Sequence, residues 1–130
     1  MEQHKDVPNL ITEWMDNLRS AWLSLDVDRA VELFSDCTEY GEDPFQEPLV
    51  RDDQIRQVWQ EIQGQLDLKV DLQLLAWTGE IATIRWYARF RTDGSPIRQF
   101  DGVYVVHFNA AGRCSRFQQW WTEGPTVQAQ

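Results

Sequence analysis

Apolar residues in the first half of the chain recur every three or four positions, which is the spacing of one helical face. The first stripe consists of Leu10, Trp14, Leu18, Ala21 and Trp22. It predicts a helix over residues 9–24. Asp26 suits the N-cap of a second short helix with an apolar face from Val27 to Phe34. A third apolar stripe predicts a helix over residues 52–63, which Gly64 ends.

Beyond Gly64 the pattern changes to alternation of apolar and polar residues, which is typical of half-buried strands. Strands are predicted over residues 37–40, 66–74, 84–91, 97–108 and 113–122. Helices followed by antiparallel strands indicate an α+β fold in which the helices cover one face of a single curved sheet. Gly102, inside an aromatic strand, indicates a bulge or a tight bend that would help to curl this sheet around the first and third helices.

Strand parity divides the predicted sheet into two faces. Phe100, Tyr104, Val106 and Phe108 share the more aromatic face, which we expect to point inward. Asp101 and His107 have the opposite parity, and a switch at Gly102 would bring them inside. On the last strand the inner set is Phe117, Gln119 and Trp121, and the outer set is Cys114, Arg116, Gln118 and Trp120.

Length, composition and charge restrict the function. The 130 residues fit one domain, with a core over about residues 9–122 and a loose tail over 123–130. The net charge of −9 disfavours nucleic acid and anionic membranes as partners. No apolar run approaches the roughly 20 residues that span a bilayer, and the first residues lack the order of a signal peptide, so we expect a cytoplasmic protein.

Few residues are available for metal or covalent chemistry. Two histidines, one of them His4 near the N-terminus, are too few for a three-histidine zinc site. Cys37 and Cys114 are read as small buried residues, because two cysteines cannot build a disulfide framework. No glycine-rich phosphate loop is present. We therefore expect neither a metal nor a cofactor.

Several segments occur together in a specific order between Leu10 and Thr122. These are the segment 26–34, Tyr40 with Asp43-Pro44-Phe45 and Pro48, Ile55-x-x-x-Trp59, the segment 108–113, and Trp120-Trp121. In this order the chain resembles the NTF2-like superfamily, and within it the SnoaL-like group that includes ketosteroid isomerases and polyketide cyclases. The resemblance implies a cone-shaped fold in which three N-terminal helices pack on a strongly curved antiparallel sheet and enclose a pocket. It leaves the reaction open, because one fold hosts many activities.

Ketosteroid isomerases within this group use an aspartate before a proline as general base, and the resemblance places that role on Asp43. Their two oxyanion donors fall on Leu18, which cannot donate, and on Tyr104, whose phenol can. The residues themselves leave alternatives open. The Asp43 carboxylate suits a base at the mouth of an aromatic cavity and equally an Asp-Pro turn in which it accepts backbone N–H groups. Tyr104 suits an oxyanion donor and equally a core tyrosine.

The predicted pocket is lined by rings and has few polar groups. Its expected lining is Trp14, Leu18, Tyr40, Phe45, Trp59, Trp86, Phe90, Asp101, Val106, Phe117, Gln119 and Trp121. Glu42 and Glu47 are expected to face water. Such a pocket suits a small hydrophobic molecule that bears an oxygen, which Gln119 could orient, although aromatic stripes also occur in solid cores.

Three functions remain open on this evidence. The first is isomerase, cyclase or lyase chemistry without a cofactor, in which Asp43 removes a proton and Tyr104 stabilises the oxyanion. The second is ligand binding without a reaction. The third is a dimerisation module. The outer sheet face carries Arg85, Tyr87, Arg89, Arg116 and Trp120, residue types that are enriched at interfaces, and members of the resembled family commonly dimerise through this face. We expect a homodimer; the alternative is a solvated face in which arginine stems cover the rings.

Overall fold

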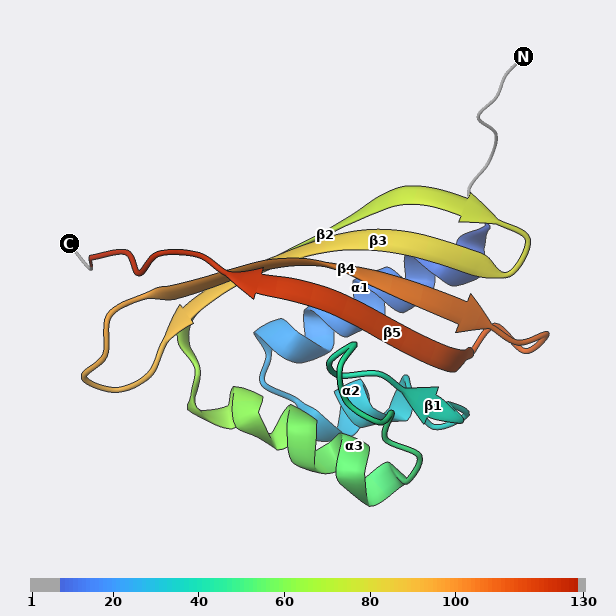
Figure 1. The fold of residues 1–130 in the computed structure, drawn as a ribbon, viewed down its shortest axis with the longest axis horizontal. Coiled ribbons are helices and arrows are strands. Elements are labelled where there is room, and N and C mark those ends of the chain that lie inside the picture. Colours follow the sequence, from blue (N-terminus) through green and yellow to red (C-terminus); the bar gives the residue numbers. More distant parts are fainter. Residues whose placement is uncertain (1–7, 129–130) are drawn as a thin grey trace, which may run out of the picture.

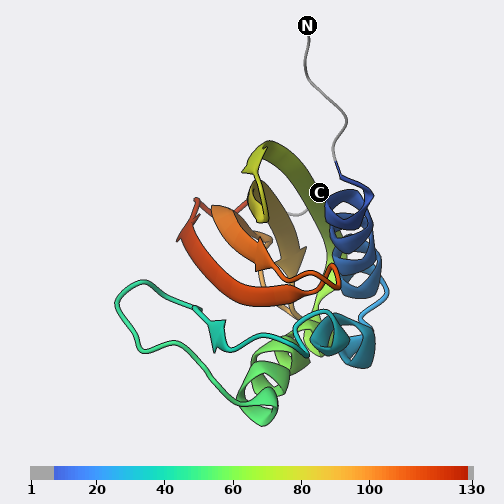
Figure 2. The ribbon, with the colours of Figure 1, turned by 90° about the vertical axis from the view of Figure 1, so that its right-hand side faces the viewer.

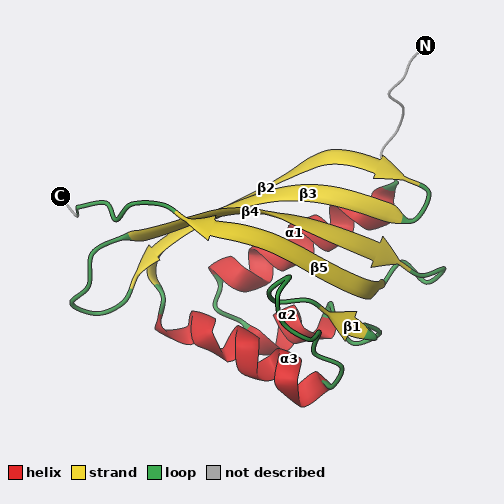
Figure 3. Ribbon diagram, in the orientation of Figure 1, coloured by secondary structure: helices red, strands yellow, loops and turns green. Residues whose placement is uncertain are grey.

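The computed structural model describes residues 8–128. In this range most of the helical residues precede the long strands of a sheet (Figure 1, Figure 3). The helical elements are α1 (Asn9–Leu23), α2 (Val27–Glu32), α3 (Asp52–Trp59) and the 3₁₀ helix η1 (Gln60–Gly64). The strands are β1 (Glu39–Tyr40), β2 (Leu66–Thr78), β3 (Ile81–Arg91), β4 (Arg98–Phe108) and β5 (Cys114–Glu123). The predicted helices and strands are confirmed, with ends that differ by a few residues.

The strands form one curved, open sheet in the order β1-β5-β4-β3-β2. Strands β2 to β5 are antiparallel neighbours, whereas β1 pairs in parallel with β5, with Tyr40 opposite Phe117. Viewed end-on, the sheet bends like an open half-barrel, with α1 along one side of its concave face and α2 and α3 at its open edge (Figure 2). The predicted α+β fold with a curved sheet is therefore confirmed.

Local interactions fix the ends of the helices. The Asp26 carboxylate accepts the backbone N–H of Arg29 at 3.2 Å, which is the predicted N-cap of α2. At the start of α3 the Gln54 side chain accepts the backbone N–H of Arg51 at 3.2 Å. The helix predicted over residues 52–63 tightens after Trp59 into η1, and this turn directs Ile62 and Gln65 toward the interior, where both are buried.

Gly102 allows a close approach between strands and forms no bulge. Residues 101, 102 and 103 of β4 pair in unbroken register with residues 122, 121 and 120 of β5. A Cβ atom at Gly102 would collide with the Trp120 carbonyl oxygen and would lie 2.6 Å from Trp86 Nε1. Because the register is unbroken, parity is kept along β4, and Asp101 lies on the outer face, where Arg85 binds it through two hydrogen bonds of 3.0 and 2.5 Å.

The irregular position in this part of the sheet lies further along β4. The pairing of β4 with β5 shifts between His107 and Phe108, so that Phe108 is opposite Cys114. The shift turns Cys114 to the inner face, where it is fully buried. The expectation that Cys114 shares the outer face with Arg116 is therefore wrong, whereas the expectation of two free, buried cysteines is confirmed.

The segment after β5 differs from the expected loose tail. The backbone N–H of Gly124 donates to the Gln99 carbonyl oxygen at 2.9 Å, and Val127 exchanges backbone hydrogen bonds with Ile97. Residues 124–127 thus extend the pairing of the sheet beyond Glu123. The last two positions of the predicted tail, 129–130, lie outside the described residues.

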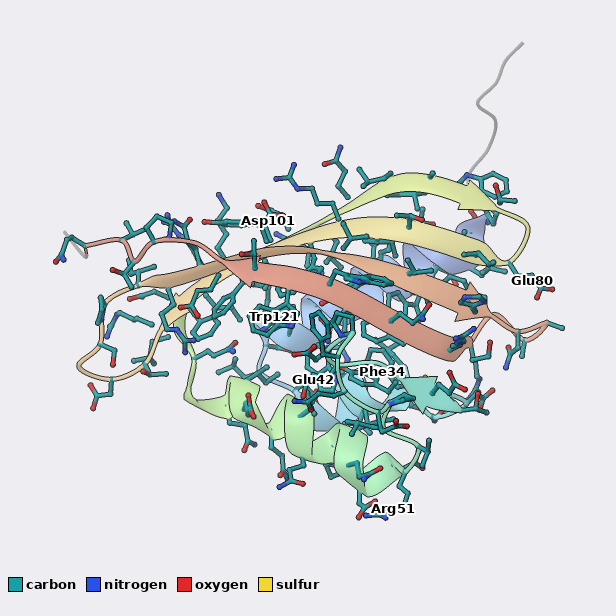
Figure 4. The ribbon with its side chains drawn as sticks, in the orientation of Figure 1. Phe34, Glu42, Arg51, Glu80, Asp101 and Trp121 are labelled. Atoms are coloured by element: carbon teal, nitrogen blue, oxygen red, sulfur yellow. The ribbon has the colours of Figure 1, made fainter. Side chains whose placement is uncertain are left out.

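A packed aromatic core fills the part of the interior between α1, α2 and the ends of β4 and β5. The Trp14 ring contacts Phe34, Phe108 and Phe117, with ring centroids 5.7, 5.8 and 6.4 Å away. Phe34, at the end of α2, lies between the helices and the sheet (Figure 4). These rings have almost no exposed surface, so this part of the interior is solid.

Candidate functional site

A cavity of about 260 Å³ lies between the concave face of the sheet and the helical segment α3–η1. It is lined by Trp22, Tyr40, Glu42, Val58, Trp59, Glu61, Ile62, Gln65, Trp86, Ala88, Phe90, Arg98, Phe100, Tyr104, Gln119 and Trp121. Its deep end consists of buried residues, and its mouth consists of half-buried or exposed ones such as Trp121, whose side chain is 46% exposed. The cavity therefore extends from the surface into the aromatic interior.

Four large rings form the deep end of the cavity. Trp22, from the end of α1, contacts Trp59 edge-on with 5.4 Å between ring centroids, and it contacts Trp86 at 5.9 Å. Trp86 stacks on Tyr104 at 5.4 Å. The two stacked rings come from neighbouring strands, whereas Trp22 and Trp59 come from helices, so sheet and helices contribute equally to this wall.

Two of these indoles carry N–H groups without a hydrogen-bond partner. Trp59 Nε1 and Trp86 Nε1 are both buried, and neither forms a hydrogen bond of good geometry with an acceptor among residues 8–128. The Tyr40 hydroxyl lies near enough to the Trp59 indole for this contact to lower the Tyr40 pKa slightly against the larger effect of burial. By contrast, Trp22 Nε1 donates to Gln65 Oε1 at 2.8 Å. A buried donor without an acceptor costs about 1–3 kcal/mol, so two unpaired donors at one cavity are unusual and need an explanation.

The phenols of Tyr40 and Tyr104 add two further donors. Burial raises the pKa of Tyr104, and burial followed by repulsion from Tyr104 and Glu42 raises the pKa of Tyr40. Both hydroxyl groups therefore remain protonated at neutral pH. The Tyr40 ring is fixed between Phe34 and Phe117, with centroids 5.0 and 4.7 Å away, so its position in the cavity wall is rigid.

The mouth of the cavity carries two carboxyl groups, Glu42 and Glu61. Burial, and then repulsion from Glu61 and Asp43, raises the pKa of Glu42. Trp121 Nε1 donates to the Glu42 carbonyl oxygen at 3.3 Å, and this contact holds the loop after β1 against the end of β5. Figure 4 shows Glu42 and Trp121 together between the sheet and α3. The expectation that Glu42 faces water is thus wrong, because its side chain is half-buried in the cavity wall.

A guanidinium group completes the mouth. Arg98 binds Glu123 through two hydrogen bonds of 2.8 and 2.9 Å, and its guanidinium carbon lies 5.0 Å above the centre of the Phe100 ring. The carboxylate of Glu123 compensates the charge of Arg98 at short range. The uncompensated charge at the mouth therefore comes from the glutamates.

Comparison with known proteins identifies the fold of the chain. No protein-family model and no curated protein sequence matches it. Similar solved structures include the epoxide hydrolase/cyclase-like enzyme SalBIII of pyran ring formation in the polyether salinomycin, with a TM-score of 0.71, 12% identity and 88% of each chain covered. An NTF2-like protein of unknown function from Exiguobacterium sp. 255-15 has a TM-score of 0.64 and 17% identity over 87% of this chain and 98% of its own. The chain has the NTF2-like fold.

A third solved structure agrees with this assignment. An LEH-like epoxide hydrolase of Mycobacterium tuberculosis has a TM-score of 0.69 and 13% identity, and the match covers 88% of this chain and 84% of that one. Identities this low show the fold alone. They confirm the resemblance to the NTF2-like superfamily at that level, and the chemistry of the site has to come from its own residues.

The cavity brings together seven of the residues that the sequence placed at a pocket. These are Tyr40, Trp59, Trp86, Phe90, Tyr104, Gln119 and Trp121. Trp14, Leu18, Val106 and Phe117 belong to the solid core instead and do not line the cavity. These four core residues share strand or helix faces with residues that line the cavity. Their positions along the strands and helices place them beyond the end of the cavity.

Three predicted residues lie away from the cavity. Asp101 binds Arg85 on the outer face of the sheet (Figure 4). Phe45 lies at the tip of the loop between β1 and α3 with 96% of its surface exposed. Asp43 precedes it, and the Asp43 carboxylate accepts the backbone N–H of Phe45 at 2.8 Å. This is the turn that the sequence left open as an alternative for Asp43, and the cavity lining does not include this residue.

Other lining residues were missed by sequence reasoning. They are Trp22, Glu42, Val58, Glu61, Ile62, Gln65, Ala88, Arg98 and Phe100. Trp22 ends the apolar stripe of α1, and Ala88 and Phe100 share strand faces with predicted residues, so their periodicity contained a usable signal. Glu61 and Gln65 gave none, because their position follows from the tight turn of η1.

Two further features bear on the kind of site. Within residues 8–128, no group of three or more histidine, cysteine, aspartate or glutamate side chains is arranged to hold a metal ion. Over the same described range, every helix is too short or too polar to cross a membrane.

Proposed function

We propose that the cavity binds a small, mainly apolar molecule that carries an oxygen able to accept hydrogen bonds. The observation that carries this proposal is that Trp59 and Trp86 both line the cavity and both have buried indole N–H groups without a partner among the described residues. An acceptor oxygen at this place would satisfy donors that the chain itself leaves unpaired. The surrounding rings would bury the apolar part of the same molecule.

Further polar groups of the wall support an oxygen-bearing ligand. Tyr40 and Tyr104 offer protonated hydroxyl groups, and Gln119 offers an amide that both donates and accepts. Donors outnumber acceptors at the deep end, since Gln65 Oε1 is already used by Trp22. A ketone, an ester or an ether fits this arrangement better than a hydrocarbon or an alcohol does.

Calorimetric titration with a matched pair of probes tests this proposal. 4-Phenylbutan-2-one has a carbonyl oxygen, and butylbenzene has nearly the same shape without one. The ketone should bind more tightly by about 1 kcal/mol, which is roughly fivefold. The double variant Trp59→Phe/Trp86→Phe should lose most of this preference, whereas Trp120→Phe, which changes an exposed indole on the outer face, should keep it.

Two outcomes would count against the proposal. One is the absence of binding of both probes at concentrations near their solubility. The other is a preference for the ketone that is equal in the wild type and in the double variant, which would mean that the two indoles contribute nothing to oxygen recognition.

Acid–base chemistry in the same cavity is a second candidate function, favoured by the position of Glu42. Its carboxyl group is half-buried in the cavity wall, and burial and neighbouring carboxylates raise its pKa, which makes it a better base near neutral pH. Tyr104 would donate to the oxyanion that forms when a proton leaves the carbon next to a carbonyl. SalBIII and the LEH-like protein are described as enzymes of pyran ring formation and of epoxide hydrolysis, which also involve oxygen-bearing molecules.

Hydrogen–deuterium exchange at the α-carbons of 4-phenylbutan-2-one, followed by NMR in D₂O, tests this second function and separates the two candidate bases. If Glu42 is the base, Glu42→Gln should slow the catalysed exchange by roughly 100-fold. Asp43→Asn should then leave it nearly unchanged, because that carboxylate belongs to a turn. If Asp43 is the base instead, Asp43→Asn should slow the exchange and Glu42→Gln should leave it nearly unchanged. Exchange no faster than in buffer would leave ligand binding as the function.

We propose in addition that the outer face of the sheet forms a homodimer. Trp120 is 46% exposed there, and its neighbour Val103 lies opposite it on β4. The surrounding arginines are already paired within the chain, Arg85 with Asp101 and Arg116 with Glu39. Such pairing reduces the cost of burying these charges against a second copy, and it leaves the apolar centre of the face free for contact.

A further inference from the structure

We infer that the ligand of this cavity carries a positively charged ammonium group in addition to its oxygen, and that Glu42, Glu61 and the rings at the mouth bind this group. The inference rests on the proposed binding function and specifies the class of molecule: a small organic amine with an apolar body and an acceptor oxygen. Four observations support it.

The first observation is the state of the two carboxyl groups. Both line the cavity, and neither forms an ion pair with any described lysine, arginine or histidine. Glu42 is half-buried, and repulsion from Glu61 and Asp43 adds to its cost of ionisation. A cation between Glu42 and Glu61 would remove this repulsion, whereas a neutral ligand would leave it in place.

The second observation concerns Arg98, the one described cationic side chain that lines the cavity. Its Nε and Nη2 atoms donate to Glu123 at 2.8 and 2.9 Å, and it forms no ion pair with Glu42 or Glu61. If Arg98 and Glu123 are counted as one neutral pair, the charged groups that remain at the mouth are Glu42 and Glu61, and both are acidic. The mouth is therefore a site of negative potential, and the net charge of −9 strengthens its attraction for cations.

The third observation is the set of rings beside these carboxylates. Phe90 stacks on Phe100 with 5.5 Å between centroids, and Trp121 contacts Phe100 edge-on at 5.8 Å. Aromatic faces attract cations, and the guanidinium of Arg98 already lies 5.0 Å above the Phe100 ring. Rings from β3, β4 and β5 thus lie at the same mouth as the two carboxylates, and aromatic cages are a common means by which proteins bind quaternary ammonium groups.

The fourth observation is independent of the acidic residues and orients the molecule. Trp59 and Trp86 line the cavity, both residues are more than nine-tenths buried, and their indole N–H groups have no partner among the described residues. An acceptor oxygen there and an ammonium group at the mouth place the polar ends of the ligand at the two ends of the cavity. The apolar body between them would contact Trp22 and Tyr104. A ligand of this kind satisfies both the donors and the carboxylates that the chain leaves unpaired.

Benzoylcholine and its neutral isostere 3,3-dimethylbutyl benzoate test the inference by calorimetric titration. They share the benzoate ester and differ in the replacement of a quaternary nitrogen by carbon, so their comparison isolates the charge. Benzoylcholine should bind roughly tenfold more tightly to the wild type. Glu42→Gln and Glu61→Gln should each reduce this preference to roughly threefold or less. Glu80→Gln, in the β2–β3 turn at the far end of the sheet, removes the same charge and should keep the preference (Figure 4).

The neutral ester separates this inference from the proposed function. Equal or tighter binding of the neutral ester would overturn the ammonium site and leave the oxygen-binding cavity supported. A preference that falls as much in Glu80→Gln as in the mouth variants would also overturn the site, since it would show an effect of overall charge. Absence of binding of both esters would overturn the site together with the proposed function. Unchanged affinity of the neutral ester in each variant shows that the cavity remains folded.

Discussion

Three buried tryptophans at one cavity differ in the state of their indole N–H groups. Trp22 has an acceptor in Gln65, whereas Trp59 and Trp86 have none among the described residues. The sequence identifies Trp59 and Trp86 as inward-facing residues, because periodicity fixes the face of an element. It cannot identify which indole is paired, because the partner of Trp22 is 43 positions away and reaches it only through the turn of η1.

A comparison of two conservative substitutions tests this difference in pairing. Trp22→Phe removes a hydrogen bond and leaves Gln65 Oε1 buried without a donor, whereas Trp86→Phe removes a donor that has no partner. Trp22→Phe should therefore reduce the free energy of unfolding by about 1–3 kcal/mol more than Trp86→Phe does. Urea denaturation followed by circular dichroism measures both. Equal losses would show that the Trp86 N–H is satisfied in solution.

Glu42 and Asp43 show the limit of sequence reasoning at the scale of one residue. The two carboxyl groups are adjacent, and both lie at the end of β1, where the sequence predicts the rim of the pocket. The structure turns Glu42 into the cavity wall and uses Asp43 to close a turn with Phe45. Their order follows from backbone geometry in an irregular loop, in which there is no period to fix the direction of a side chain.

The regular elements were largely predictable, because their apolar positions repeat with the period of a helix or a strand. The exceptions are positions where two strands change register. The shift after His107 moves Cys114 to the inner face, and parity counted along β5 alone cannot reveal it. Gly102 was recognised as special, but its role is a close approach between strands. The atoms that require it belong to Trp86 and Trp120, on two different neighbouring strands.

Substitution of Gly102 tests this close approach. In Gly102→Ala the new Cβ would collide with the Trp120 carbonyl oxygen and would lie 2.6 Å from Trp86 Nε1, so β4 and β5 must separate. We expect a loss of about 1–3 kcal/mol in the free energy of unfolding, together with weaker binding of 4-phenylbutan-2-one. Gly64→Ala is the matched control, because no atom lies within 4 Å of its added Cβ. A Gly102→Ala protein as stable as this control would contradict the account of the sheet.

The interior of the whole molecule has two parts that the sequence cannot tell apart. Trp14 and Phe117 belong to a solid core near α2, whereas Trp59 and Trp86 line a cavity near η1. All four face inward by periodicity. The division depends on where α1 and α3 cross the curved sheet, and that depends on contacts between distant segments. This is why the patterns predict the fold as a whole and the lining only in part.

Assembly is a prediction for the molecule as a whole. If the outer sheet face forms a homodimer, Trp120→Glu places a charge at the centre of the interface and should shift the protein to a monomer in analytical ultracentrifugation. Leu23→Glu is the control, because Leu23 is an exposed apolar residue of α1, on the helical side of the sheet. A wild-type protein that sediments as a monomer at high concentration would contradict the homodimer.

The most direct test of the cavity is the NMR signal of its indole N–H groups. In ¹⁵N-labelled protein, with signals assigned through Trp→Phe variants, saturating 4-phenylbutan-2-one should move the Trp59 and Trp86 Nε1–H resonances downfield, because a new acceptor deshields the proton. The Trp120 resonance, on the outer face, should not move. Resonances of Trp59 and Trp86 that stay in place while the ketone is bound would show that its oxygen does not meet these donors, and the central claim would be wrong.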